Sequence, residues 1–145
     1  MATAIRESIL ANVYAALKGI GQVRAFRNLT SRPTEIPCLV LFDSPETAEP
    51  AAPPLHQVEM DLDIEAWTAA RTEDELGPAL NALLLKTSAA LFADVTRGGL
   101  AIDTRYAGVA QPVLDKTAGG TPLIGAIFTF KITYWTADAD LSAAI

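Results

Sequence analysis

The chain has one cysteine, one histidine and few basic residues, and each scarcity argues against a class of protein. Cys38 is the only cysteine among 145 residues, so an internal disulfide is impossible and a reducing compartment is expected. The 11 lysines and arginines against 17 acidic residues give a net charge of -6, which argues against specific nucleic-acid binding. No apolar run reaches the length of a membrane span, and Met1–Arg6 lacks a secretion pattern, so no membrane contact is expected.

Motifs of phosphate and cofactor chemistry are also missing. The sequence has no glycine-rich loop of the phosphate-binding type and no dinucleotide fingerprint, and its two Gly-Gly pairs are typical of turns. The single histidine, His56, borders a proline-rich stretch. The sequence therefore predicts no catalytic residue, no cofactor and no metal ion. A small cytosolic enzyme that uses His56 and nearby carboxylates remains an alternative, because catalytic groups can assemble from distant segments.

The strongest structural pattern is the alternation in Leu123–Thr136. Large apolar residues occupy its even positions, including Phe128 and Phe130, whereas Thr129 and Lys131 occupy odd ones. A period of two with β-branched and aromatic residues predicts a half-buried strand. Something apolar must cover that face. Since half the residues are hydrophobic, the chain has enough apolar material for one domain over residues 1–145.

Two helices are available to cover that strand. Apolar residues recur at helical spacing in Thr3–Lys18, with Thr3 as the expected N-cap, and in Thr72–Val95, where Thr72 and Glu75 match a capping box. We expect strands at Gly21–Asn28, Ile36–Asp43, Leu55–Trp67, Ala101–Val109, Gln111–Asp115 and Leu123–Thr136. We expect a projecting proline-rich loop at 44–54 and a flexible tail at 138–145. The predicted fold is α+β, with two helices on one face of a mostly antiparallel mixed sheet.

Four carboxylates form the most prominent polar pattern. Glu59, Asp61, Asp63 and Glu65 alternate with apolar residues along one strand, so they share the sheet face away from the helices; we call them the acidic stripe. Neighbours on one strand face lie about 6.6–6.8 Å apart, so four of them cannot converge on one hard metal ion without further ligands from loops. The stripe is therefore expected to be solvated or to face another subunit.

Basic and aromatic residues complete this candidate surface. Side chains on other strands could neutralise the stripe, either within the chain or from a neighbouring subunit. Trp67 and Trp135 are expected on the less apolar sheet face or at its ends, where exposed aromatic rings favour a protein contact. The candidate interface or channel-facing residues are Glu59, Asp61, Asp63, Glu65, Arg24, Arg27, Arg105, Lys131 and Trp135.

Several segments together resemble a known family. Ile5–Leu10 with Val13 and Leu17, Ile36–Val40, the alternating strand Glu59–Trp67 and the closing Phe128–Thr136 resemble the lambda-type tail terminator proteins of tailed phages, within the tail completion superfamily. The likeness covers residues 3 to 136 and rests on structural patterns rather than signature residues. The proline-rich stretch from Pro45 to Pro54 is a local departure from it.

The resemblance implies a structural protein rather than an enzyme. Such minor tail proteins form a homo-oligomeric ring, a hexamer in relatives, that caps the tail tube, stops its polymerisation and joins the head. The implied partners are a tail tube protein and a head–tail connector protein. The implied location is the tail of a phage or prophage virion, assembled in the bacterial host cytoplasm. Another connector, tail completion or neck protein of the same superfamily is the alternative.

Overall fold

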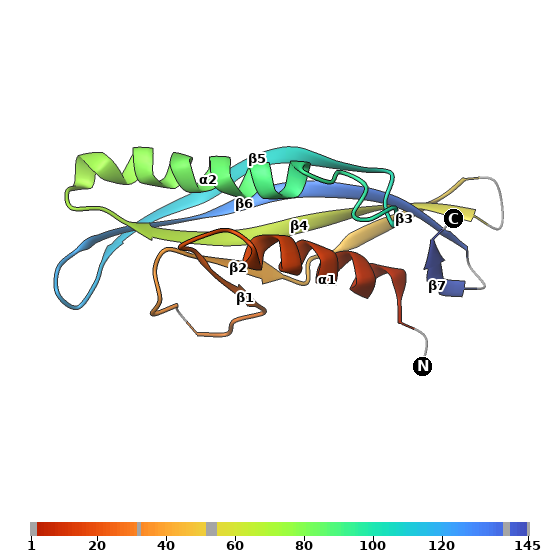
Figure 1. The fold of residues 1–145 in the computed structure, drawn as a ribbon, viewed down its shortest axis with the longest axis horizontal. Coiled ribbons are helices and arrows are strands. Elements are labelled where there is room, and N and C mark those ends of the chain that lie inside the picture. The colour runs from red at the N-terminus through yellow and green to blue at the C-terminus, as the bar shows by residue number, and fades with distance from the viewer. Residues whose placement is uncertain (1–2, 32, 52–54, 138–139, 145) are drawn as a thin grey trace.

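The computed structural model describes residues 3–31, 33–51, 55–137 and 140–144. The described chain forms two layers, with α1 and α2 lying on the same side of a long, twisted sheet (Figure 1). The bounds of its elements are α1 Ile5–Lys18, β1 Arg24–Arg27, β2 Cys38–Phe42, β3 Glu46–Pro50, β4 Leu55–Ala69, a 3₁₀ turn Glu73–Glu75, α2 Leu76–Phe92, β5 Asp103–Lys116, β6 Pro122–Ala137 and β7 Asp140–Ala144. The predicted α+β class is confirmed.

The sheet is mixed but mostly antiparallel. Within the described residues its seven strands follow the order β1-β2-β4-β6-β5, with β3 on β4 and β7 on β6 outside this path. Only the β1–β2 pair among these is parallel. The long strands β4 and β6 pair along their whole length, from Leu55 opposite Ala137 to Ala69 opposite Leu123. They form the centre of the sheet, and β5 forms one of its edges.

The core lies between this centre and the helices. The even-numbered residues of β4 and β6 point into it, and Phe128, Phe130, Leu62 and Ile64 are all fully buried. Both helices contribute a stripe of apolar residues: Ile5, Ile9, Leu10, Val13 and Leu17 from α1, and Leu76, Leu80, Leu83 and Leu91 from α2. The alternation in the sequence therefore predicted the buried face correctly.

The helix starts differ from the prediction. α1 begins at Ile5 with Ala4 as its N-cap, and α2 begins at Leu76 after the 3₁₀ turn, with no side-chain capping bond at either helix or at Thr72. The expected caps from Thr3 and Thr72 are therefore wrong. Pro78 explains the later start of α2, because proline fits the first helical turn, where amides lack intrahelical partners.

Two segments expected to be irregular form strands instead. Within the expected loop 44–54, Glu46–Pro50 is the strand β3, paired with β4 from Met60 to His56. Within the expected tail 138–145, Asp140–Ala144 is β7, paired with β6. Both strands lie beside stretches of β4 and β6 that no other strand pairs with on that side. The unpaired backbone N–H and C=O groups there can bond to an extended segment. The remaining parts of these two predictions, 52–54, 138–139 and 145, lie outside the described residues.

The two expected strands at Ala101–Val109 and Gln111–Asp115 are one strand, β5. Its pairing with β6 shifts register between Tyr106 and Gly108 and again between Ala110 and Val113. Gly108 and Gln111 have positive φ angles of 125° and 52° at these irregularities. Such bulges bend a strand without ending it, so a break in the sequence pattern does not become a break in the structure.

Candidate functional site

The acidic stripe lies on the sheet face that carries no helix, which we call the open face. Its four carboxylates stand on β4 opposite Thr133, Lys131, Thr129 and Ile127 of β6, and all four are half-buried. The even-numbered neighbours of the stripe on β4 are buried in the core. Because successive side chains of a strand point to opposite faces, the stripe lies on the face away from the helices, as the sequence predicted.

Two basic residues neutralise one half of the stripe. The Lys131 Nζ lies 2.8 Å from a Glu59 carboxylate oxygen and 3.6 Å from one of Asp61. Arg105, on β5, lies 3.2 Å from Glu59 and 3.9 Å from Asp103. The hydrogen bond from Lys131 lowers the pKa of Glu59 and raises that of Lys131. The expected pairing of Arg105 and Lys131 with the stripe is therefore present within one chain.

The other half of the stripe binds neutral donors. The Thr129 hydroxyl lies 3.3 Å from an Asp63 carboxylate oxygen, and the Trp67 indole N–H donates to Glu65. These bonds orient the carboxylates without cancelling their charge. Asp63 and Glu65 are accordingly the negatively charged end of the stripe.

Arg24 and Arg27 do not meet the stripe. Arg27 pairs with Leu41 in register, which puts its side chain on the helix-covered face. Arg24 is on the open face, but β2 separates its strand from β4, and it pairs with Glu35 at 2.9 Å. Of the two possibilities left open by the sequence, pairing with the stripe within the chain or from a neighbouring subunit, the first does not apply to Arg24 and Arg27, because β2 lies between β1 and β4.

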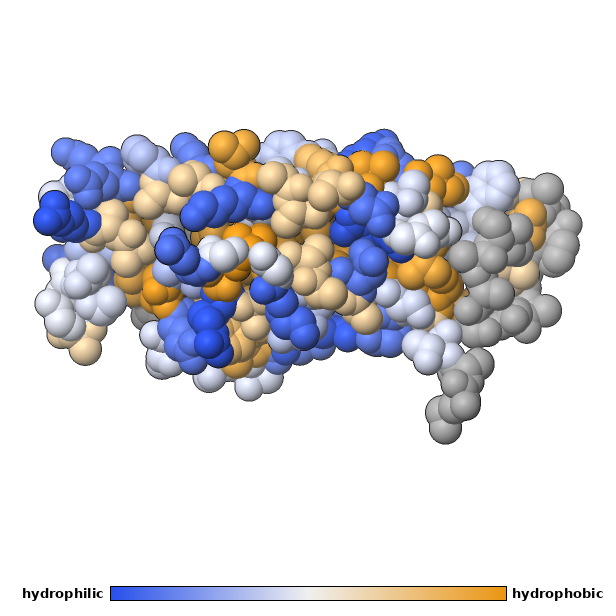
Figure 2. Space-filling view, in the orientation of Figure 1, coloured by the Kyte–Doolittle hydropathy of each residue, from blue (hydrophilic) through white to orange (hydrophobic). Residues whose placement is uncertain are grey.

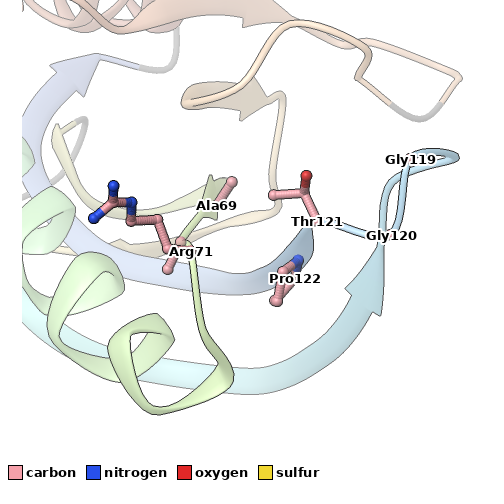
Figure 3. A pocket seen from close by; sticks show the side chains of 7 residues that line it. Ala69, Arg71, Gly119, Gly120, Thr121 and Pro122 are labelled. Atoms are coloured by element: carbon pink, nitrogen blue, oxygen red, sulfur yellow. The ribbon is translucent and has the colours of Figure 1, made fainter.

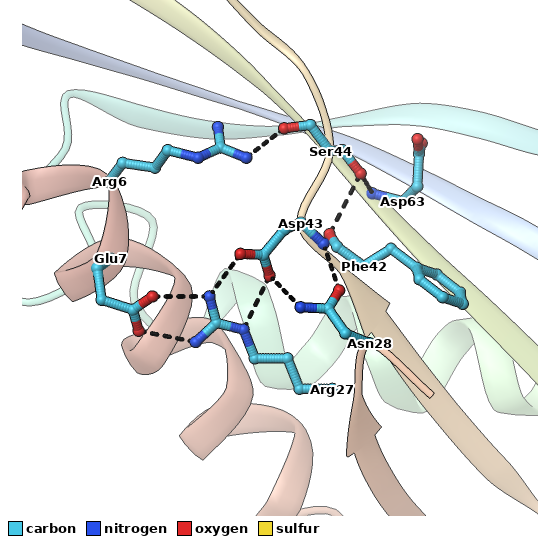
Figure 4. A network of polar contacts seen from close by, with 8 residues as sticks. All are labelled: Arg6, Glu7, Arg27, Asn28, Phe42, Asp43, Ser44 and Asp63. Atoms are coloured by element: carbon cyan, nitrogen blue, oxygen red, sulfur yellow. Dashed lines mark hydrogen bonds and ion pairs between the residues drawn. The ribbon is translucent and has the colours of Figure 1, made fainter. Parts of the chain in front are cut away.

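Arg27 instead joins three elements (Figure 4). Its guanidinium contacts both carboxylate oxygens of Glu7 on α1, at 2.7 and 2.8 Å, and both of Asp43 after β2, at 2.9 Å. Asn28 adds a bond of 3.0 Å to Asp43. The hydrogen bonds from Arg27 lower the pKa values of Glu7 and Asp43. This cluster ties α1 to the β1 edge of the sheet.

Both tryptophans lie on the open face, as predicted. Trp135 stands opposite Gln57 and donates its indole N–H to the Gln57 side chain at 3.2 Å, and 37% of Trp135 is exposed. Trp67 stands opposite Gly125, next to Glu65. The open face therefore combines unneutralised carboxylates with aromatic rings, which is a surface suited to contact with another macromolecule.

A polar cluster that the sequence did not predict lies at the β3 end of the molecule. Tyr134 donates to Glu46 at 2.8 Å, and Arg6 lies 3.2 Å from the same carboxylate and also donates to the Ser44 carbonyl. These side chains and His56 line a cavity of about 450 Å³. Burial and the bond to Glu46 raise the pKa of Tyr134. The cluster was missed because Glu46 falls in the segment expected to be a loop.

A second hollow lies at the opposite end, beside the turn between β5 and β6 (Figure 3). It has a volume of about 520 Å³ and is lined by Ala69, Ala70, Arg71, Gly119, Gly120, Thr121 and Pro122. Arg71 is the only ionisable residue among these. The other lining residues are small or apolar. It offers no pair of groups for acid–base or nucleophilic chemistry.

Metal-ligating side chains do not cluster in the described part of the chain. There, no group of three or more histidine, cysteine, aspartate or glutamate side chains is arranged to hold a metal ion. No helix among the described residues is both long enough and apolar enough to cross a membrane. Cys38 is buried, and its burial raises the pKa of its thiol to about 11.

Comparisons with known proteins add little to this geometry. No protein-family model and no curated protein matches the chain. Among solved structures, it is similar to a chain of the virion of a native gene transfer agent particle. That alignment covers 90% of this chain and 95% of the other, with 10% sequence identity and a TM-score of 0.35. A likeness of that size carries no argument about function.

Proposed function

We propose that this protein is a phage or prophage tail terminator. In this role it forms a ring on the end of a finished tail tube, stops further polymerisation and presents a surface to the head connector. It is a structural protein of the virion tail rather than an enzyme. The resemblance to tail terminators implies the hexameric ring and the two partners, a tube protein and a connector protein.

The open face is the observation that carries this proposal. Within the described residues no helix covers this side of the sheet, and the acidic stripe and both tryptophans lie there. A subunit of an assembly can use such a surface for contacts with its neighbours or to line a channel. The segments that resemble tail terminators, including α1, β4 and β6, are the ones that build this sheet and its cover.

The ion pairs of the four candidate basic residues help to decide whether the acidic stripe would face a neighbouring subunit or the channel of a ring. Arg24, Arg27, Arg105 and Lys131 each have a carboxylate partner within their own chain. The reason for expecting the stripe to bind basic residues of a neighbour is therefore weaker. Asp63 and Glu65 keep their charge, which favours a stripe that faces the channel and repels the phosphates of passing DNA.

Tube polymerisation in the presence of this protein tests the proposal. The cognate tube protein, polymerised with and without the chain, is measured by electron microscopy for length and for a cap at one end. We expect shorter tubes that carry a terminal ring. Tubes of unchanged length and bare ends would contradict the proposal.

Two further measurements separate the alternatives. A connector or neck protein would bind DNA-filled heads in the absence of tubes, so co-sedimentation with heads or with tubes distinguishes the two roles. An enzyme that uses His56 would lose its function in His56→Ala. A terminator with that substitution is expected to cap tubes normally, provided its melting temperature is unchanged.

A further inference from the structure

Exposed apolar side chains gather along the edge of the molecule formed by α2 and β5. Leu85 is 72% exposed and Leu114 is 71% exposed, and Phe92, Tyr106 and Val109 are each exposed by more than a third. Hydrophobic atoms recur along this edge in Figure 2, over α2 and β5. We call these five residues the α2–β5 surface.

The surface is continuous because α2 and β5 run side by side in opposite directions. At one end the rings of Phe92 and Tyr106 both pack edge-on against Phe130, with centroids 5.9 and 5.7 Å away. At the other end Leu76, at the start of α2, and Leu114, near the end of β5, line one cavity of about 350 Å³. Leu85 precedes Phe92 by seven residues and so shares its helix face.

The outer edge of β5 is poorly suited to pair with another strand. Its two register shifts disturb the backbone ladder, and Pro112, within the second of them, has no amide hydrogen to donate. Such features are typical of edges that avoid strand addition. Contact at this edge therefore depends on the apolar side chains rather than on backbone hydrogen bonds.

Charge identifies what could cover the surface. Glu73, Asp74 and Glu75 precede α2 and are exposed, while Asp115 and the exposed Lys116 lie together beside the Leu114 cavity. Within the described residues the opposite edge of the sheet is β1, covered by α1. There the exposed Lys18 lies 4.6 Å from the ring of Tyr14, while Arg24, the first residue of β1, is paired with Glu35 at 2.9 Å. The end of α1 and the start of α2 point toward the same end of the molecule (Figure 1).

We propose that the α2–β5 surface binds a second copy of this chain through the α1–β1 edge of that copy. In this contact Lys18 of one copy approaches the acidic start of α2 in the next, while the apolar residues are removed from water. Two different surfaces then meet, so the contact repeats from copy to copy and can close a ring. The inference rests on the ring proposed above and names the surfaces that would form it.

Cysteine cross-linking tests which surfaces meet. A variant with Leu114→Cys and Lys18→Cys places one thiol on each surface, and the native Cys38 is buried and does not interfere. After oxidation we expect a ladder of linked chains on a non-reducing gel, ending at the ring number. Each single substitution should give only monomers. A matched control pairs Leu114→Cys with Gln57→Cys, which is exposed on the open face. Dimers of the single Leu114→Cys variant, or an equal ladder from the control pair, would overturn the proposal.

A second measurement uses charge instead of a cross-link. Leu85→Glu with Leu114→Glu should raise the dissociation constant of self-association at least tenfold in analytical ultracentrifugation. Leu141→Glu, at a 60% exposed leucine of β7, is the control and should leave it unchanged. If the double variant still forms rings on tube ends, this surface is excluded while the terminator role stands. If even the native chain forms no ring and leaves tube length unregulated, the proposed function fails as well.

Discussion

The ring of Trp67 lies directly over Gly125 on the open face. The two residues stand opposite each other on β4 and β6, and a Cβ built on Gly125 would lie 2.8 Å from three carbons of the indole ring. Contacts that short do not occur in folded proteins, so the indole occupies the space that a side chain at this position would need. The glycine exposes backbone that the aromatic ring then covers, a pairing that protects a glycine within a sheet.

Gly125→Ala is therefore expected to displace the Trp67 ring. Overpacking of this kind costs about 1–3 kcal/mol in the free energy of unfolding. Urea unfolding measures the loss, and the tryptophan emission of the folded state should change because Trp67 moves. Gly21→Ala is the control, since nothing lies within 4 Å of a Cβ there. Equal stability and equal emission for Gly125→Ala would show that the indole does not occupy the space that a side chain at this position needs.

Phe130 should be among the most costly residues to truncate. It is fully buried beneath α2 and is the common neighbour of the Phe92 and Tyr106 rings. Phe130→Ala is expected to lower the free energy of unfolding by about 3–5 kcal/mol, as for other buried aromatic residues. Leu85→Ala, at an exposed position on α2, should change it by less than about 0.5 kcal/mol. A loss below about 1 kcal/mol for Phe130→Ala would mean that this strand is not the core.

The predicted faces of β4 and β6 are correct because alternation is a local property. Successive side chains of a strand point to opposite faces of the sheet. The face of each residue in the acidic stripe therefore follows from its position along β4, whatever strands lie beside it. Pairings between segments are not local, and these were missed. The Arg27 cluster joins residues 16 and 20 positions apart, and the pairing of β3 depends on β4 having a free edge there.

Arg97 shows the same limit within a loop. It is 1% exposed and donates to the main-chain carbonyls of Leu91, in the last turn of α2, and of Asp94, just after the helix. The sequence shows only a charged residue before Gly98 and Gly99, which is typical of a solvated turn. The burial of Arg97 is a consequence of tertiary packing. The carbonyls to which it donates lack helical partners only because α2 ends here.

The Arg27 cluster should make stability depend on acid pH. The usual pKa values of Glu7 and Asp43 are 4.5 and 3.8, and both are lowered in the folded protein. Their stabilising effect is present above those values and is lost as the pH falls through the lowered ones. We expect the melting temperature to drop on acidification below about pH 4.5 and to drop less in Arg27→Met. Because both carboxylates are partly exposed, the coupling between Arg27 and Glu7 should be only about 1 kcal/mol in a double-mutant cycle. Equal acid sensitivity of the native chain and Arg27→Met would contradict this account.

The Cys38 thiol should be inert in the folded protein. It is fully buried, and its pKa of about 11 keeps it protonated at neutral pH. Alkylation by iodoacetamide at pH 8 should be slow in buffer and fast in denaturing urea. A fast reaction in buffer would show that β2 opens readily.

The last prediction concerns the negatively charged end of the acidic stripe. Asp63→Lys with Glu65→Lys reverses two charges that are bound to neutral donors, so no ion pair within the chain is broken. Both side chains project from the open face, and the fold should survive with a melting temperature close to the native one. If the stripe lines the channel, rings should assemble normally, but the new lysines should bind DNA phosphates and slow packaging or injection. That defect should weaken as salt screens the charges.

The neutral pair Asp63→Asn with Glu65→Gln is the matched control, because it removes the repulsion without adding attraction. Under the channel-facing account it should pass DNA almost as well as the native protein. If the stripe instead contacts basic residues of a neighbouring subunit, both double variants should assemble poorly, and the lysine variant more so. Normal assembly and normal infectivity for the lysine variant would show that this end of the stripe faces only solvent. An assembly assay followed by an infectivity assay at two salt concentrations therefore assigns the stripe to the channel, to a subunit contact or to neither.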